Sequence, residues 1–288
     1  MLKKLNKYLL IFLLLSLAVV LNALGTLPDN KLHVKVYDVG QGDSVLITTP
    51  AGKHILVDGG PGNKLVSLLG ASLPFYSRAL DVVVLTHPHE DHLSGLVEVL
   101  KHYEVAQVWM EKVVHTTDLY LSWLDLLKTK KIKVGAPKIG DQIEYPDGVR
   151  IKILWPKQEL IKEESDLNST SIVMLLEYKN FSALLTGDAG QNDQPYAWSL
   201  DSWKSRKKLD LLKVPHHGSS TGLKDEFLEV VKPSVAIVSV GAKNKYGHPS
   251  KVTLEKLANS DSKVFRTDTS GSVEVVSDGE GWYTKTEK

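Results

Sequence analysis

Three apolar runs of this chain end in histidine or aspartate, and this feature restricts the possible folds more than any other. Short apolar runs that are bounded by Gly, Pro or Asp are typical of buried strands. The segments that follow these runs are His-Pro-His-Glu-Asp-His at 87–92, Gly-Asp at 187–188 and His-His at 216–217. Ligands and catalytic groups tend to collect on the loops that leave a sheet edge. We therefore expect a sheet-based fold that brings these three segments together.

The segment 87–92 has a spacing that suits metal chelation. His87 and His89 are two residues apart, so in an extended segment both rings point to one side and can hold one metal. Asp91 and His92 follow at the turn before an expected helix, which directs them towards a second position nearby. Neutral imidazole and carboxylate ligands suit Zn²⁺, with Mn²⁺ or Fe as alternatives.

Further candidate ligands follow the later strands. Asp188, in Leu-Leu-Thr-Gly-Asp, could bridge two metals with its two oxygens, although Gly-Asp alone is also a turn signal. His216 and His217 follow the third run, and His248 lies in Tyr-Gly-His-Pro-Ser after a fourth. We expect these three histidines together to complete both metal positions, and the sequence leaves their division open.

The composition excludes thiol chemistry. The chain contains no Cys, so disulfides, a thiol nucleophile and thiolate ligands are ruled out. Any metal must therefore be held by imidazole and carboxylate groups. Without the three N-terminal lysines, 32 basic residues stand against 34 acidic ones. A domain whose overall field attracts nucleic acid is normally basic, and this one is not.

Residues 1–25 form a separate segment. Lys3, Lys4 and Lys7 precede an almost unbroken apolar run over 8–21, which is the order of a secretory signal peptide. The run is shorter than the roughly 20 residues of a membrane span, but an uncleaved N-terminal membrane anchor stays open. Both alternatives predict an extracytoplasmic protein, secreted or held at the membrane by this segment.

Residues 31–288 are expected to form one domain of the α/β (α+β) class. We expect helices at 64–71, 93–101, 119–128, 224–231 and 251–259. Strands are expected at 32–37, 44–48, 54–57, 81–86, 105–109, 149–154, 171–178, 182–186, 209–214, 234–240 and 263–266. Two mixed sheets between helices satisfy this order of elements.

The motifs together resemble the metallo-β-lactamase superfamily. His87-x-His89-x-Asp91-His92 resembles its metal-binding signature, and Asp58 resembles its upstream aspartate, which usually orients a ligand rather than binding metal. The finer similarity, over about 33–282, is to the hydrolase domain of ComEC-type competence proteins, which take up DNA. It is carried by Tyr-Asp-Val-Gly-Gln-Gly-Asp-Ser at 37–44, Leu-Leu-Thr-Gly-Asp at 184–188, Lys-Val-Pro-His-His-Gly-Ser at 213–219 and Tyr-Gly-His-Pro-Ser at 246–250. The resemblance implies an αββα sandwich with metals at one edge.

Two departures limit this resemblance. The superfamily commonly has a further metal-binding histidine before the Gly-Asp strand, whereas Asn168 stands where that histidine is expected. The missing imidazole must be replaced, or one metal is weakly held. The many membrane spans of a full competence channel are also absent, so only the hydrolase function carries over.

The resemblance implies a two-metal hydrolase, with a phosphodiesterase or nuclease acting on extracellular DNA as the first hypothesis. Two divalent ions, Zn or Mn, would activate a bridging water and polarise the phosphoryl group. The implied metal ligands are His87, His89, Asp91, His92, Asp188 and one of His216 and His217. Asp58 would orient a ligand, and the spare histidine or His248 would protonate the leaving group. Lys243, Lys245 and Ser219 are candidates for phosphate contact and are equally compatible with plain surface positions.

Two other functions stay open. The near-neutral charge is compatible with another ester as substrate, such as a phosphorylcholine-type ester or a lactone. A non-catalytic binding module on the same fold would keep the motifs without the chemistry. Hydrolysis of β-lactams is not expected, because Asp188 stands where zinc β-lactamases often use Cys. No sequence pattern indicates the oligomeric state.

Overall fold

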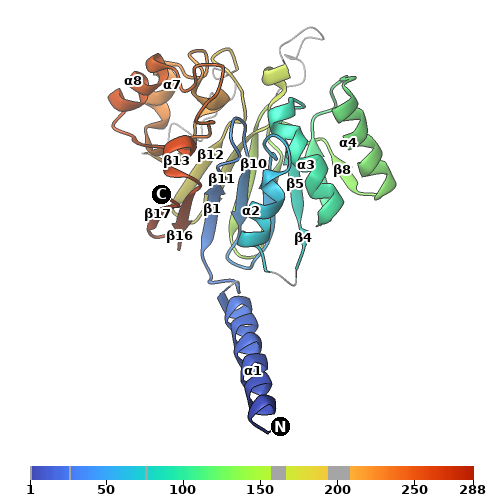
Figure 1. The fold of residues 1–288 in the computed structure, drawn as a ribbon. Helices are drawn as coiled ribbons and strands as arrows, with labels where there is room; N and C mark the ends of the chain where they lie inside the picture. Colours follow the sequence, from blue (N-terminus) through green and yellow to red (C-terminus); the bar gives the residue numbers. More distant parts are fainter. Residues whose placement is uncertain (1, 26, 75–76, 157–166, 194–207) are drawn as a thin grey trace.

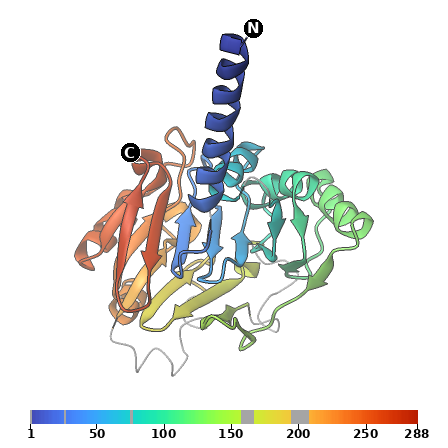
Figure 2. The same ribbon diagram turned by 90° about the horizontal axis from the view of Figure 1, so that it is seen from below.

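Two β-sheets pack face to face between two layers of helices (Figures 1 and 2). The computed structural model describes residues 2–25, 27–74, 77–156, 167–193 and 208–288. The first sheet has the strand order β17 (Trp282–Thr286), β16 (Val273–Ser277), β1 (Leu32–Val36), β2 (Val45–Thr48), β3 (His54–Val57), β5 (Val82–Leu85), β7 (Gln107–Met110) and β8 (Lys133–Gly135). The second has the order β15 (Lys263–Arg266), β14 (Pro233–Val238), β13 (Leu209–Lys213), β12 (Phe181–Leu185), β11 (Val173–Tyr178), β10 (Val149–Trp155) and β9 (Gln142–Glu144).

Helices cover the outer face of each sheet. The first sheet packs against α2 (Lys64–Ser72), α3 (Glu90–His102) and α4 (Asp118–Thr129), and the second against α7 (Asp225–Val231) and α8 (Lys251–Asn259). The smaller elements are the paired strands β4 (Ala79–Leu80) and β6 (Glu104–Val105), the 3₁₀ turns η2 (Leu167–Thr170) and η3 (Pro215–Gly218), and α9 (Thr267–Ser270). The expected αββα sandwich is therefore confirmed.

The two-residue period of the strands explains the layers. In β3, Ile55 and Val57 point between the sheets, whereas Leu56 points towards α2 and α3. In β5, Val84 lies between the sheets and Val83 lies under the helices. Because both faces of these central strands are covered, they contain almost only apolar residues.

Each sheet changes from antiparallel to parallel pairing along its width. Strands β1, β2 and β3 pair antiparallel, and β3, β5, β7 and β8 pair parallel. In the second sheet β10, β11 and β12 are antiparallel, and β12, β13, β14 and β15 are parallel. The loops that follow β5, β12 and β13 lie together at one edge of the two sheets (Figure 1). This edge carries the histidines and aspartates that the sequence singles out.

The five helices expected in the domain are confirmed, with ends that shift by at most a few residues. The sequence reasoning missed β4, β6, β8, β9, β16 and β17. Five of these are very short or lie at or next to a sheet edge, so their own residues carry a weak apolar pattern. β16 is a plain omission, since its alternating valines are buried against β1, from which it is about 240 residues distant in the chain.

The segment 1–25 forms α1 (Leu2–Gly25), which projects away from the two sheets (Figures 1 and 2). Its apolar side chains are exposed, for example Tyr8 at 68% and Phe12 at 66%. Over the part of the chain whose side chains are described, no helix is long and apolar enough to span a membrane. The interpretation of 1–25 as a leader or anchor stays a prediction.

Gly59 and Gly95 allow α3 to pack closely against the loop that follows β3. The amide of Gly59 donates to the carbonyl oxygen of His92 over 2.7 Å, and the amide of Gly95 donates to that of Gly60 over 2.9 Å. A Cβ atom on Gly95 would overlap the carbonyl of Gly59, and one on Gly59 would overlap the amide of Leu96. This close contact sets the position of the first turn of α3, which carries Asp91 and His92.

We expect Gly95→Ala to destabilise the fold by about 2 kcal/mol or more, because the added methyl group forces α3 away from the β3 loop. Gly70→Ala is the matched control. Gly70 is also helical, but its nearest neighbour to an added Cβ is the Tyr103 hydroxyl at 3.9 Å. That variant should gain up to about 1 kcal/mol from helix propensity. Denaturant unfolding measures the free energy of unfolding of both variants. Equal changes in this free energy for Gly95→Ala and Gly70→Ala would contradict the close contact at Gly95.

Candidate metal centre

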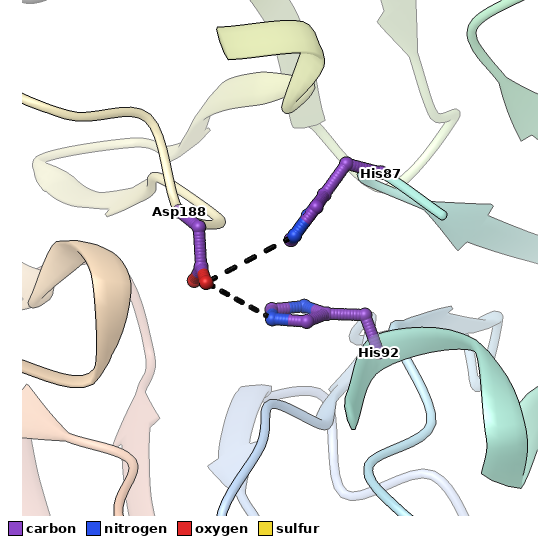
Figure 3. A group of neighbouring side chains, drawn as sticks. All are labelled: His87, His92 and Asp188. Atoms are coloured by element: carbon purple, nitrogen blue, oxygen red, sulfur yellow. Dashed lines mark ion pairs between the residues drawn. The ribbon is translucent and has the colours of Figure 1, made fainter. Parts of the chain in front are cut away.

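Asp188 lies at the centre of a buried cluster formed by both sheets. His87 follows β5, His92 lies in the first turn of α3, and Asp188 follows β12 (Figure 3). The Oδ2 atom of Asp188 is 3.9 Å from His87 Nε2 and 3.3 Å from His92 Nε2. It is also 3.4 Å from His217 Nε2, which η3 delivers from the end of β13. All four side chains are buried.

The other residues of the 87–92 segment extend this cluster. His89 Nδ1 lies 3.1 Å from His87 Nε2, so two imidazole nitrogens face one point. Asp91 Oδ2 lies 3.2 Å from His217 Nε2. The side-by-side placement expected from the spacing of His87 and His89 is therefore observed. The ring of His92 lies as near, with its centroid 4.1 Å from that of His87, so His92 is not directed to a separate position.

The turn at 216–217 separates two neighbouring histidines. His216 and His217 have φ angles of 49° and 51°, a left-handed conformation that is uncommon for residues other than glycine. His217 points into the cluster, where its Nδ1 contacts the carbonyl oxygen of Ser239 at 3.0 Å. The ring of His216 lies 6.2 Å from that of His217 and 5.8 Å from that of His248, and both His216 and His248 line the adjoining pocket. Of the three histidines expected to complete the metal positions, only His217 contacts Asp188 among the described contacts.

Asp58 contacts His92 at Nδ1, the ring nitrogen that does not face Asp188. One oxygen of Asp58 lies 2.8 Å from His92 Nδ1 and accepts from the Thr86 hydroxyl over 2.7 Å. The other accepts from the Thr86 amide over 2.8 Å. A carboxylate on Nδ1 sets the orientation of the ring and leaves Nε2 available to a metal. This geometry agrees with the orienting role that the resemblance implied for Asp58.

Two hydroxyl groups place His87 in the same way. The Nδ1 atom of His87 lies 3.1 Å from Thr86 Oγ1 and 3.3 Å from Ser171 Oγ. Ser171 Oγ also accepts from the backbone amide of Asp188 over 3.1 Å. His87 and Asp188 come from different sheets, so Ser171 links their positions. No sequence pattern indicates this role of Ser171, because isolated hydroxyl residues are common in loops.

A buried ion pair between Asp43 and Lys213 was also missed by the sequence reasoning. Both side chains are buried and contact each other directly. Asp43 Oδ1 is 3.3 Å from His217 Nδ1, and Lys213 donates to the carbonyl oxygen of Gly187 over 3.1 Å. Both residues lie in motifs that carry the family resemblance, at 37–44 and 213–219, which was the available signal. The ion pair of Asp43 and Lys213 therefore links the loop before β2 to the ends of β12 and β13.

The charges of the cluster shift its pKa values strongly. Burial alone would lower the pKa of His92, but Asp188 and Asp58 outweigh it and raise this pKa well above its ordinary value. The same balance, with Asp188 and Asp43 as partners, raises the pKa of His217. Burial would raise the pKa of Asp188, yet His217 and His92 hold it well below its usual range. Without a metal, protons on two histidines therefore balance the buried carboxylates.

The donor atoms fit a divalent metal. The buried atoms of the described residues that make no hydrogen bond include His92 Nε2, His217 Nε2 and Asp188 Oδ1 of this cluster. Buried polar atoms normally have a partner, and atoms of this kind that converge suit a cation. Four groups of three His or Asp residues have ligand atoms within 4.8 Å of one another. They are His87–His92–Asp188, Asp91–His92–His217, Asp43–Asp58–His92 and Asp43–Asp188–His217.

A pocket of about 350 Å³ opens beside the cluster. Its walls include His89, Asp188 and Asn168, the residue that stands in the sequence where a further metal-binding histidine was expected. His248 stands on another side of the pocket, and burial, followed by its neighbours His216 and His217, lowers its pKa.

The three candidates for phosphate contact differ in their surroundings. Lys243 and Lys245 are exposed on the loop that precedes His248. Ser219 is buried, with its hydroxyl 3.1 Å from that of Thr221 and its carbonyl oxygen accepting from Thr253 over 2.8 Å. These contacts indicate that Ser219 stabilises its own turn.

Comparisons with known proteins agree with this geometry. The model of the Metallo-beta-lactamase superfamily matches residues 37–242. The chain is 28% identical over 259 residues to ComE operon protein 3 of Bacillus subtilis, which covers 84% of this chain and 32% of that protein. It is 31% identical over 250 residues to Recombination protein 2 of Haemophilus influenzae, which covers 84% of this chain and 28% of that protein. The chain thus spans about a third of the length of these relatives.

A solved structure supports the fold. The metallo-beta-lactamase fold protein YhfI from Bacillus subtilis superposes with a TM-score of 0.54 at 14% identity, over 84% of this chain and 99% of that one. At this level of identity the similarity concerns the fold alone.

Metal binding should release protons at neutral pH. The raised pKa values of His92 and His217 mean that both hold protons at pH 7 in the metal-free chain, and a metal must displace them. We therefore expect the apparent metal affinity to rise with pH through neutrality, because both groups lose their protons only above their ordinary range. Calorimetry in buffers of different ionisation enthalpy measures the protons released. His33→Gln, which changes a histidine outside the site, should release the same number, and the absence of release at pH 7 would contradict the charge balance.

Lys213→Met should destabilise the metal-free chain by about 3 kcal/mol or more, because it leaves Asp43 buried without its cation. The matched control is Lys53→Met, which removes the partner of Asp81 from an exposed ion pair and should cost no more than about 1 kcal/mol. Denaturant unfolding measures both. Adding Asp43→Asn to Lys213→Met should recover part of the loss, and equal small losses in the two single variants would refute this role of the ion pair.

Proposed function

Because this chain belongs to the metallo-beta-lactamase superfamily and is a metal-dependent hydrolase, we propose that it hydrolyses phosphodiester bonds in DNA. The observation that carries the proposal is the convergence of three imidazoles on the buried carboxylate of Asp188, beside an open pocket. The similarity to a ComE operon protein, a recombination protein and a competence protein supports DNA as the substrate class.

Two divalent ions would be held in adjoining positions. His87 Nε2 and His89 Nδ1 face one position, and Asp91 and His217 Nε2 face the other, with His92 Nε2 close to ligands of both. Asp188 would reach both, because it is close to ligands of each. Zn²⁺ and Mn²⁺ both suit this set. Asn168 in place of an imidazole favours Mn²⁺ at the first position, since Mn²⁺ prefers oxygen ligands.

When bound, such a pair supplies hydroxide at neutral pH and balances the charge of the attacked phosphoryl group. The protein's own groups do the positioning. Asp58 sets the orientation of His92 through its Nδ1 atom, and the carbonyl oxygen of Ser239 does the same for His217. His248 lines the same pocket as Asp188 and His217, and it would protonate the leaving oxygen.

As part of the same proposal, the domain acts outside the cytoplasm. Lys3, Lys4 and Lys7 lie at the start of α1 and precede its apolar run over 8–21, which is the order of an export signal. DNA outside the cell, rather than the chromosome, would then be the substrate.

The purified full chain, loaded with Mn²⁺ or with Zn²⁺, is expected to cleave single-stranded oligonucleotides and bis-p-nitrophenyl phosphate. Asp188→Asn should lower the turnover on the order of a hundredfold or more, because it removes the charge that both positions share. Asp81→Asn, which changes an aspartate of an exposed ion pair, should keep the wild-type rate. Metal content is measured in each preparation.

Protein that contains two metals per chain but cleaves neither substrate would overturn the proposal. Hydrolysis of a lactone or a phosphorylcholine-type ester in the same panel would point to another ester instead. The location is tested with the same pair of variants in a host that lacks secreted nucleases. Intact cells with the wild-type chain should cleave added oligonucleotide, and activity that appears only after lysis would refute an extracytoplasmic site.

A further inference from the structure

Tyr246 stands at the mouth of the metal pocket with 58% of its surface exposed. Outside α1, the only other exposed Phe, Trp or Tyr side chain among the described residues is Tyr283, at 46%. The ring of Tyr246 lies against the ring of His248, with centroids 5.9 Å apart and planes inclined by 20°. An apolar ring is thus presented to solvent next to the group that we assign to leaving-group protonation.

The loop that carries Tyr246 is held in shape by Asn244. The side-chain amide of Asn244 donates to the carbonyl oxygens of Gly241 over 2.9 Å and His248 over 2.7 Å. Its oxygen accepts from the amides of Tyr246 over 3.2 Å and His248 over 2.9 Å. Gly241 in turn donates to the side-chain oxygen of Gln41, which also lines the pocket, over 3.1 Å. The exposed ring is therefore preorganised, which reduces the entropy lost when a ligand stacks on it.

One cation lies at the ring, and a second is exposed on the same loop. Lys243 and Lys245 are exposed on the same loop, and Lys245 Nζ lies 5.3 Å from the ring centroid of Tyr246. Because the domain as a whole is close to neutral, these charges act locally at the pocket. An exposed aromatic ring beside lysines is the arrangement that binds single-stranded nucleic acid, where bases stack and phosphates contact cations.

We propose that Tyr246 forms a nucleobase subsite of the metal pocket. A base adjoining the scissile phosphate stacks on the exposed ring, and Lys243 and Lys245 contact the phosphates on either side of it. Bases in a duplex are already stacked on their neighbours, so the subsite selects single-stranded DNA. This inference rests on the proposed function and adds the strand type and the recognition element.

The test compares two ligands of equal charge and length. One is a short oligothymidylate and the other the same backbone with abasic sites, both with phosphorothioate linkages that slow cleavage. Fluorescence anisotropy measures their affinity for the full, metal-loaded chain. Wild-type protein should bind the oligothymidylate at least about five-fold more tightly, which is the lower end of the contribution of one base–aromatic stack.

Tyr246→Ala should lose this difference, and Tyr246→Phe should keep it. Tyr283→Ala is the matched control, because Tyr283 is also an exposed tyrosine with lysines near its ring but lines no part of the pocket. Equal binding of the two ligands by the wild type, or an unchanged preference in Tyr246→Ala, would overturn the subsite. Unfolding curves of all variants show whether the fold is retained.

The outcomes separate this inference from the proposed function. Base-dependent binding that needs Tyr246, without any cleavage, would support the subsite and refute the nuclease. Cleavage of DNA with the same KM in wild type and Tyr246→Ala would support the nuclease and refute the subsite.

Discussion

The buried carboxylate of Asp188 is the group on which the rest of the site depends. A charge removed from water must be balanced by cations, and three imidazoles from both sheets face Asp188 for this purpose. In the metal-free chain, protons on His92 and His217 supply the positive charge. A divalent metal supplies it without protons. The two sheets of the sandwich are therefore joined at this edge by electrostatics as well as by the apolar core.

An outer layer of contacts keeps these ligands in place. Asp58 orients His92, and the pair of Asp43 and Lys213 supports His217. The close contact of Gly59 and Gly95, between the loop after β3 and α3, sets the position of the first turn of α3. This layer is buried, whereas the pocket mouth with Tyr246 is exposed. The metal ligands and the base subsite that we propose thus lie in parts of the fold with opposite solvent exposure.

Much of the fold could be predicted from the sequence. The helices of the domain and the central strands have strong apolar periodicity or continuous apolar runs, as at Val82–Leu85, and their burial follows from it. β17 could not be found in this way, because its residues are largely exposed and its only partner is β16. Its existence is decided by pairing, not by its own pattern.

The sequence alone determined the chemistry of the site. The absence of Cys and the spacing of His87, His89, Asp91 and His92 require imidazole and carboxylate ligands, and strand ends place them at one edge. Only the tertiary structure decided that His217, and not His216, faces Asp188. The two rings point in different directions because both residues have a left-handed backbone conformation in this turn. The tertiary structure also decided that Asp43 and Lys213 meet behind the ligands. Such contacts join residues distant in the chain, and no local pattern specifies which distant side chains will share one buried space.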